Sequence, residues 1–285
     1  MNKLPKQRQV QIIHALCEGN SLRSTSRMVG VSINTVVKLL IDMGTAAAEY
    51  QDGALRNLTC RRLQMDEIWS FCYAKQKNVP EAHQGELGYG DTWTWTAIDS
   101  DSKLIVSWLV GHRDGETARD FVDDVAIRLA HRVQLTTDGL KAYLEAVEEA
   151  FGAAIDYAQL IKLYGPELGG EKRYSPATCI GTDTNVIQGQ PEAKYISTSY
   201  VERQNLSMRM GMRRFTRLTN AFSKKLENHM HAVSLYFLHY NFARPHTTLT
   251  KANKGYPTTP AMAAGLTDHV WTINEMLGLL AADSN

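Results

Sequence analysis

The stretch CRRLQMDEIWSFCYA, residues 60–74, decides which fold the rest of the chain can adopt. Most of its residues are typical of a buried β-strand, but the acids Asp66 and Glu67 interrupt it in the middle. Because successive side chains of a strand point to opposite faces of a sheet, Asp66 and Glu67 are expected on opposite faces. An acid inside an apolar strand indicates either a strand edge or a carboxylate with a function.

Strand and helix patterns follow this stretch in an order that predicts the architecture. Two strands joined by Ser-Asp-Ser predict a hairpin, and helix–strand units come after it. A hairpin followed by α/β crossovers predicts an α/β fold, with a mixed five-stranded sheet flanked by helices. The expected strands are 60–74, 92–99, 103–110, 132–139 and 155–164, and the expected helices between them are 115–132 and 140–152.

A long loop is expected after the last of these strands. Residues 165–197 hold eight glycines and prolines in 33 residues. Loops of that length inside a compact domain are usually functional or disordered. Two helices are expected after the loop, one containing Glu202 and another near 222–242.

The first 45 residues predict a small all-α unit. Three short helices are expected at 6–18, 21–30 and 32–44, the last ended by Gly44. Short helices joined by a glycine-containing turn are typical of the helix-turn-helix, and an ordinary three-helix bundle is the alternative. The polar leading edge of the third helix is expected to contact DNA through Ser32, Asn34, Thr35 and Lys38.

The charges are unevenly distributed along a chain whose formal net charge is only +1. Residues 1–45 carry +4 and residues 201–285 carry +5, which leaves −8 for residues 46–200. Basic flanks around an acidic centre suit a protein that binds a polyanion at its ends and metal ions in its middle.

The cysteines and the hydropathy pattern predict a cytoplasmic protein without a membrane partner. The four cysteines form no CxxC pair, so no zinc or redox motif is indicated, and reduced, buried thiols are expected. The N-terminus lacks the apolar centre of a signal peptide. The longest apolar run, near 104–111, is too short to span a bilayer.

Three carboxylates stand out by position: Asp66 inside a strand, Asp138 at the carboxyl end of another, and Glu202 in the first turn of a helix. Each has a structural alternative, namely a strand edge, a turn with Gly139, and a capping box that begins at Ser199. Together they match phosphoryl transfer, which needs two hard cations roughly 4 Å apart. Mg²⁺ (or Mn²⁺) prefers oxygen ligands, so a few carboxylates suffice.

Five sequence blocks carry a resemblance to a known group of enzymes. Asp66, Asp138 and Glu202, separated by 71 and 63 residues, resemble the Asp-Asp-Glu triad of insertion-sequence transposases and retroviral integrases. The blocks resemble transposases related to the insertion sequence one family: MDEIW (65–69), TTDGLKAY (136–143), TSYVERQN (198–205), RRFTRLTNAFSKK (213–225) and YNFARPHTTL (240–249).

The resemblance implies an RNase H-like fold in which the two Asp strands are adjacent. It divides the chain into a helix-turn-helix domain (1–45), a linker (46–59), an RNase H-like catalytic domain (60–264) and a C-terminal tail (265–285). One signature of related families is incomplete: Tyr195 is present, but Thr198 stands in place of Arg and Arg209 in place of Lys.

The same resemblance implies a bacterial, nucleoid-associated transposase. Such an enzyme binds the terminal inverted repeats of its element and uses two divalent ions, held by the triad, to cut double-stranded DNA and join it to a target. It acts on paired ends, so a homodimer or a higher oligomer is expected. The alternatives are a catalytically inactive DNA-binding protein or regulator with this fold, and an RNase H-like nuclease.

Seven basic residues separate Glu202 from the next acid, Glu227. If residues 202–213 form one helix, Glu202, Asn205, Arg209 and Arg213 share a face. This pattern predicts that the helix follows DNA phosphates beside the metal site. The residues expected to contact DNA here are Arg203, Asn205, Arg209, Arg213 and Arg214.

Overall fold

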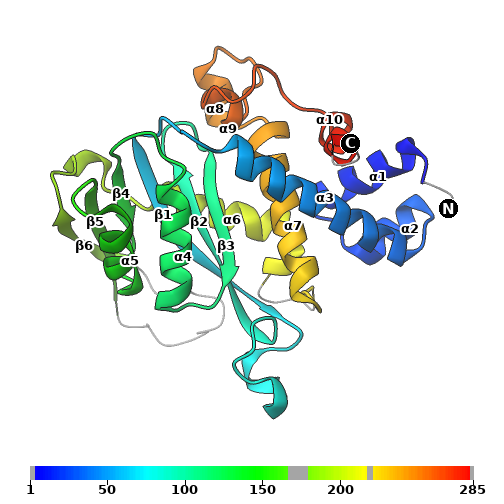
Figure 1. The fold of residues 1–285 in the computed structure, drawn as a ribbon, viewed down its shortest axis with the longest axis horizontal. Helices are drawn as coiled ribbons and strands as arrows, with labels where there is room; N and C mark the ends of the chain where they lie inside the picture. The colour runs from blue at the N-terminus through cyan, green and yellow to red at the C-terminus, as the bar shows by residue number, and fades with distance from the viewer. Residues whose placement is uncertain (1–3, 166–178, 217–220, 283–285) are drawn as a thin grey trace.

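The computed structural model describes residues 4–165, 179–216 and 221–282 (Figure 1). Its centre is a mixed six-stranded sheet in the order β3-β2-β1-β4-β5-β6. β1 pairs antiparallel with β2 and parallel with β4, so it joins the hairpin to the crossover half of the sheet. The strands are β1 (Arg62–Cys72), β2 (Gly90–Asp99), β3 (Ile105–Gly111), β4 (Gln134–Thr137), β5 (Asp156–Tyr164) and β6 (Cys179–Gln188).

Five of these strands confirm the sequence prediction, and the sixth corrects it. β6 lies inside the predicted loop 165–197 and pairs antiparallel with β5. It escaped prediction because nearly all of its residues are exposed on both faces, so it has no alternation of apolar and polar residues. Residues 166–178 of that loop lie outside the described residues.

Helices cover both faces of the sheet, each over its own hydrophobic core (Figure 1). On one face, α4 and α5 pack over Leu63, Met65 and Leu135, while on the other α6 and α7 pack over Ile68 and Ile98. The helices are α1 (Lys6–Cys17), α2 (Leu22–Val29), α3 (Ile33–Ala54), α4 (Gly115–Ala126), α5 (Ala142–Phe151), α6 (Ser199–Gly211), α7 (Leu226–Leu238), α8 (Thr247–Ala252), α9 (Pro260–Ala263) and α10 (Ile273–Ala282).

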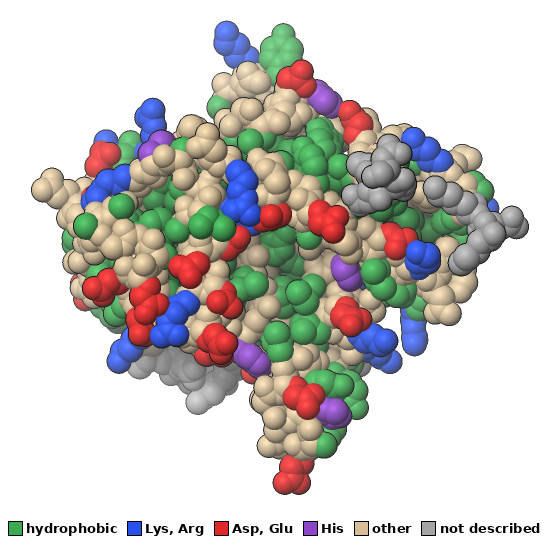
Figure 2. Space-filling model, in the orientation of Figure 1, with side chains coloured by type: hydrophobic (Ala, Val, Ile, Leu, Met, Phe, Trp, Pro, Cys, Tyr) green, Lys and Arg blue, Asp and Glu red, His purple; other side chains and the backbone are tan. Residues whose placement is uncertain are grey.

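The face that α4 and α5 cover is acidic on its outer surface. α4 carries Glu116, Asp120, Asp123 and Asp124, and α5 carries three glutamates. On the face where Figure 1 draws α4 and α5, Figure 2 shows several acidic side chains with a few basic ones among them. A polyanion is repelled from this side of the molecule.

The third predicted helix does not end at Gly44, because α3 continues to Ala54. Gly44 lies where α3 crosses α7, and a Cβ at this position would come within 2.6 Å of the Cα of His231. The glycine therefore permits a close contact between helices. Most of the range 46–59, expected as a linker, is helical, and the expected boundary at residue 45 falls inside a helix.

The C-terminal segment is also more ordered than the predicted tail 265–285. α10 packs beside α1 and α3, and Met276 and Leu277 are buried in the larger of the two cores. That core also includes Ile12 of α1 and Leu135 of β4, so one hydrophobic cluster connects the N-terminal helices to the sheet.

Two predictions from composition can be compared directly with the structure. Cys17, Cys60 and Cys72 are buried as expected, but Cys179 is exposed on β6, so the expectation of a buried thiol is wrong there. Among the described residues, no single helix has the length and apolarity to cross a membrane; by those two criteria alone, α2 and α3 would pass as a pair, bent by 115°.

Gly44→Ala should destabilise the protein by about 2 kcal/mol, because overpacking a tight contact typically costs about 1–3 kcal/mol. The matched control is Gly53→Ala in the same helix, where a Cβ meets nothing within 4 Å. That change should stabilise by about 0.5–1 kcal/mol through helix propensity. Urea unfolding of the two variants checks the pair, and equal effects would contradict the packing role of Gly44.

His229 gives the stability a dependence on pH. It is fully buried, its Nδ1 lies 2.9 Å from Ser223 Oγ, and burial, with the charge of Arg214, lowers its pKa from 6.5 to about 3. Below pH 6.5, His229 binds a proton in the unfolded chain but not in the folded chain. The contribution of the neutral His229 to the free energy of unfolding is therefore complete above pH 6.5 and is lost as the pH falls toward 3.

Between pH 7 and pH 5 the wild type should therefore lose about 2 kcal/mol more stability than His229→Gln, since each pH unit contributes about 1.4 kcal/mol. Urea denaturation at both pH values measures the difference. His131→Gln, which replaces an exposed histidine, should keep the wild-type dependence of stability on pH. If His229→Gln lost as much stability between pH 7 and pH 5 as the wild type, His229 would not be the source of the pH dependence.

Candidate metal centre

The position of α6 is set by β1, whose even-numbered side chains face this helix. Gln64 Oε1 accepts hydrogen bonds from the backbone amides of Tyr200 (2.8 Å) and Val201 (3.1 Å). These amides are in the first turn of α6, where no intrahelical acceptor exists for them. A side chain from the central strand thus caps the helix and fixes its N-terminus above the sheet.

Asp66 is two residues further along β1 and faces the same helix. Its Oδ2 accepts a hydrogen bond from Asn205 Nδ2 (2.8 Å), and its Oδ1 accepts one from the amide of Glu67 (2.9 Å). Asn205 is itself buried on α6. The carboxylate is therefore held in one orientation between the strand and the helix.

Glu67 points to the opposite face, as its place in the strand predicts. Its Oε1 accepts from Arg113 Nε (2.6 Å), and its Oε2 accepts from the hydroxyl of Tyr143 on α5 (3.2 Å). Its side chain is almost completely buried. Glu67 is thus anchored from the side of the sheet that α4 and α5 cover.

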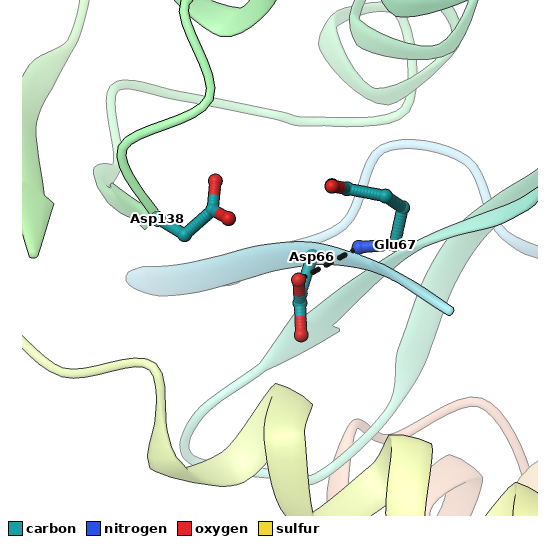
Figure 3. A group of neighbouring side chains, drawn as sticks. All are labelled: Asp66, Glu67 and Asp138. Carbon is teal, nitrogen blue, oxygen red and sulfur yellow. Dashed lines mark hydrogen bonds between the residues drawn. The ribbon is translucent and has the colours of Figure 1, made fainter. Parts of the chain in front are cut away.

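Asp138 directly follows β4, the parallel neighbour of β1. Its Oδ1 accepts from the amide of Leu140 (2.9 Å), which fixes the turn at the strand end. Asp66, Glu67 and Asp138 each offer a carboxylate oxygen, and these oxygens lie within 4.8 Å of one another. Figure 3 shows Asp66 pointing toward α6, while Glu67 and Asp138 lie on the other side of the strand.

The structure thus brings together two of the three expected ligands, Asp66 and Asp138, and adds Glu67. Glu67 was not among the expected ligands, because the alternation of side chains along a strand places it on the opposite face from Asp66. That placement is correct, but the oxygens meet because Asp138 lies at the end of a strand. The one sequence feature that could have indicated Glu67 as a member of the cluster is its position next to Asp66.

Glu202, the third expected ligand, lies in the first turn of α6 but is not one of these three neighbours. Its carboxylate accepts a hydrogen bond from Thr198 Oγ1 (2.6 Å) and forms an ion pair with Lys162 of β5. The capping box that begins at Ser199, the structural alternative for Glu202, is not formed, since the Ser199 amide donates to Ser197 Oγ. Glu202 is nevertheless close enough to contribute to the electrostatic field at Asp66.

Burial and mutual repulsion disfavour the charged forms of Asp66 and Glu67. The pKa of Asp66 is raised to about 8 by burial first, and then by the charges of Glu67, Asp138 and Glu202. The pKa of Glu67 is also raised by burial and by Asp138, although Arg113 opposes the shift. Among the described residues, no lysine, arginine or histidine forms an ion pair with Asp66 or Asp138. A bound cation would relieve this excess of negative charge.

The donors fit a divalent metal with a preference for oxygen. Three carboxylates supply oxygens within a small volume. The carbonyl oxygen Oδ1 of Asn205 is buried, and no described group donates a hydrogen bond to it. Such an acceptor beside Asp66 is an additional oxygen for a hard cation such as Mg²⁺ or Mn²⁺.

The residues expected to contact DNA have different surroundings. Asn205 is buried against Asp66, and Arg213 lies beyond the end of α6 at Gly211, so the expected shared face of Glu202 and Arg213 is not formed. The guanidinium of Arg214 donates to Ser223 Oγ (2.8 Å) and is turned inward. Arg203 is exposed and Arg209 half-buried.

On the N-terminal unit, Ser32 caps α3 by accepting from the Asn34 amide (3.2 Å). Asn34 is exposed and Thr35 is half-buried. Lys38 is also exposed, and its ammonium pairs with Asp42 one turn later (2.9 Å). Asn34 and Lys38 are therefore open to solvent for a partner.

Comparison with known proteins gives weak likenesses. No protein-family model and no curated protein matches the sequence. The fold is similar to a piggyBac transposase in a synaptic complex with hairpin DNA, at a TM-score of 0.42 and 8% identity, over 99% of this chain and 73% of that one. Two structures of Mos1 give TM-scores of 0.30: a mariner paired-end complex with Mn (8% identity; 99% and 81% covered) and a pre-cleavage transpososome (9%; 100% and 82%). At these scores the likenesses establish no family.

Lys162→Gln removes the positive charge that holds Glu202. If Glu202 belongs to the metal site, apo protein should bind Mn²⁺ more tightly, by up to about fivefold, since an exposed ion pair is worth up to about 1 kcal/mol. Isothermal titration calorimetry measures the affinity. Lys194→Gln, which breaks the exposed pair with Glu192, is the matched control and should have no effect. Equal affinity of Lys162→Gln and wild type would place Glu202 outside the site.

Proposed function

We propose that the chain is a DNA transposase that binds the terminal inverted repeats of an insertion sequence and catalyses metal-dependent cleavage and strand transfer. The observation that carries the proposal is the meeting of Asp66 and Asp138 on neighbouring parallel strands, with further oxygen donors beside them. The sequence resemblance to Asp-Asp-Glu transposases adds to it. The Asp-bearing strands are adjacent, as that resemblance implies.

Two divalent ions bound there would supply Lewis-acid activation of an attacking hydroxyl and stabilisation of the leaving oxygen. Asp66 is the central ligand, and Asn205 keeps its carboxylate in one orientation. Asp138 comes from the strand end and Glu202 from the covering helix. Glu202 must first exchange its contact with Lys162 for the metal site, which leaves the ammonium of Lys162 available for a phosphate.

Glu67 is the alternative to Glu202 as the third metal ligand. Its hydrogen bonds to Arg113 and Tyr143 favour a structural role instead. Arg113 and Tyr143 occupy both of its oxygens from the far side of the sheet. To bind an ion with both contacts broken, Glu67 would leave a buried tyrosine hydroxyl without its acceptor. Glu202 is half-exposed on a surface helix and is the easier carboxylate to move.

DNA is the partner in this proposal. α2 and α3 meet at 115° across a short turn, within the range of a helix-turn-helix, and Asn34 and Lys38 are exposed at the start of α3. This unit would bind the element ends, with Ser32 and Thr35 beside these two residues. A homodimer or larger assembly on paired ends, in a bacterial cytoplasm, belongs to the same proposal.

The test is a cleavage assay on linear DNA that bears both ends of the genetic element encoding the chain, with Mg²⁺ present. Asp66→Asn, Asp138→Asn and Glu202→Gln should each reduce cleavage at least about a hundredfold, because each removes a charged metal ligand. Asp120→Asn, an exposed acid on α4, is the matched control and should cleave as wild type.

Other outcomes separate the alternatives. A wild-type protein that binds the ends without nicking them would be a DNA-binding regulator with this fold. Nicking that ignores the end sequence would indicate an RNase H-like nuclease. Cleavage that survives in Glu202→Gln and is lost in Glu67→Gln would move the third ligand to the other face of the sheet.

A further inference from the structure

A groove of about 920 Å³ lies between the N-terminal helices and the described residues 211–214 and 221–225, near the end of α6 and before α7. The end of α1 and the starts of α2 and α3 form one wall, and the end of α6 and the start of α7 form the other. The walls meet where two glycines approach each other: a Cβ on Gly19 would lie 3.1 Å from the carbonyl carbon of Gly211. The backbone contact closes the groove at this point and leaves no space for side chains.

The described charged side chains that line the groove are all positive. Among the described residues that line it, none is an aspartate or glutamate, and none of its cations pairs with an acid that the structure describes. All but Arg214 are exposed, so they reach solvent along the groove. The cations are Arg23, Arg213, Arg214, Lys224 and Lys225.

Arg214 differs from the others because it is half-buried and its guanidinium is hydrogen-bonded within the protein. It donates to Ser223 Oγ, and burial lowers its pKa to about 10, so it remains charged at neutral pH. A buried cation without an anionic partner is destabilising. An anion in the groove would relieve this penalty.

The spacing of the cations indicates the shape of that anion. Arg23 comes from α2, Arg213 from the turn after α6, and the two lysines from the residues just before α7. Such a spread suits an extended polyanion better than a single phosphate group, which needs converging donors. Between the cations lie Asn20, Ser21, Asn34 and Asn228, residue types that commonly contact the nucleic-acid backbone.

We propose that this groove binds the sugar-phosphate backbone of double-stranded DNA. The inference rests on the proposed function for the choice of DNA, and it adds that one duplex touches the N-terminal helices and the end of α6 together. The outer surface of α4 and α5 is acidic and contributes no residue to the groove, so it is a less favourable path for DNA.

The test uses the full chain and a fluorescein-labelled 30-base-pair duplex, followed by fluorescence anisotropy at several salt concentrations. Lys224→Ala/Lys225→Ala should bind at least about tenfold more weakly at 0.1 M salt. It should also reduce the slope of log affinity against log salt by about 1.8, because two phosphate contacts are lost. Lys77→Ala/Lys251→Ala removes two equally exposed charges outside the groove and should leave affinity and slope at the wild-type values.

Unchanged affinity and slope in the groove variant, or an equal loss in the control, would overturn the inference. Both groove lysines are exposed, and an unchanged melting temperature verifies folding. Arg214→Lys, which keeps the charge but not the fork of donors, should also weaken binding. If the groove variants bind normally while end cleavage requires Asp66, only this inference fails. If they lose binding while Asp66→Asn still cleaves, the metal mechanism fails and the groove stands.

Discussion

The two-residue alternation along β1 is the constraint on which the rest of the site depends. Gln64 and Asp66 face α6, where one caps the helix and the other accepts from Asn205. Met65 and Glu67 face the opposite core. A shift of one residue in the register of β1 would bury the two α6-facing side chains under α5 and leave the N-terminus of α6 without its acceptor. The position of the helix and the orientation of Asp66 therefore follow from one register.

Some charged side chains are placed where they reduce the stability of the folded protein. Among the described residues, no cation pairs with Asp66 or Asp138, and no acid pairs with the half-buried Arg214. Each arrangement raises the free energy of the folded chain relative to an apolar core. Proteins keep such groups where a ligand completes them, and the two sites call for ligands of opposite charge. A divalent cation fits the first and a polyanion the second.

The sequence predicted the elements whose residues alternate or repeat with a clear period. β1 to β5 follow from runs such as TWTWTAID, and the meeting of Asp66 with Asp138 follows from two adjacent parallel strands. The features that the local sequence pattern did not predict depend on residues that are far away in the sequence. Gly44 resembles a helix stop until His231 is known to lie against it, and β6 has no periodic pattern because it lies exposed at the sheet edge. The ion pair of Glu202 with Lys162 likewise joins residues 40 positions apart.

α6 connects the two candidate sites and sets their separation. Glu202 lies in its first turn, and Gly211, at its end, contacts Gly19 at the closed point of the groove. Nine residues of helix span about 14 Å at 1.5 Å per residue. Phosphates follow one another at about 3.4 Å along the axis of one strand of a duplex, so this length corresponds to about four base pairs. A duplex held in the groove would thus place a phosphate at the carboxylates only a few base pairs from the groove cations. Under the proposed function, this one helix, capped by Gln64, would set which bond of the DNA lies opposite the carboxylates.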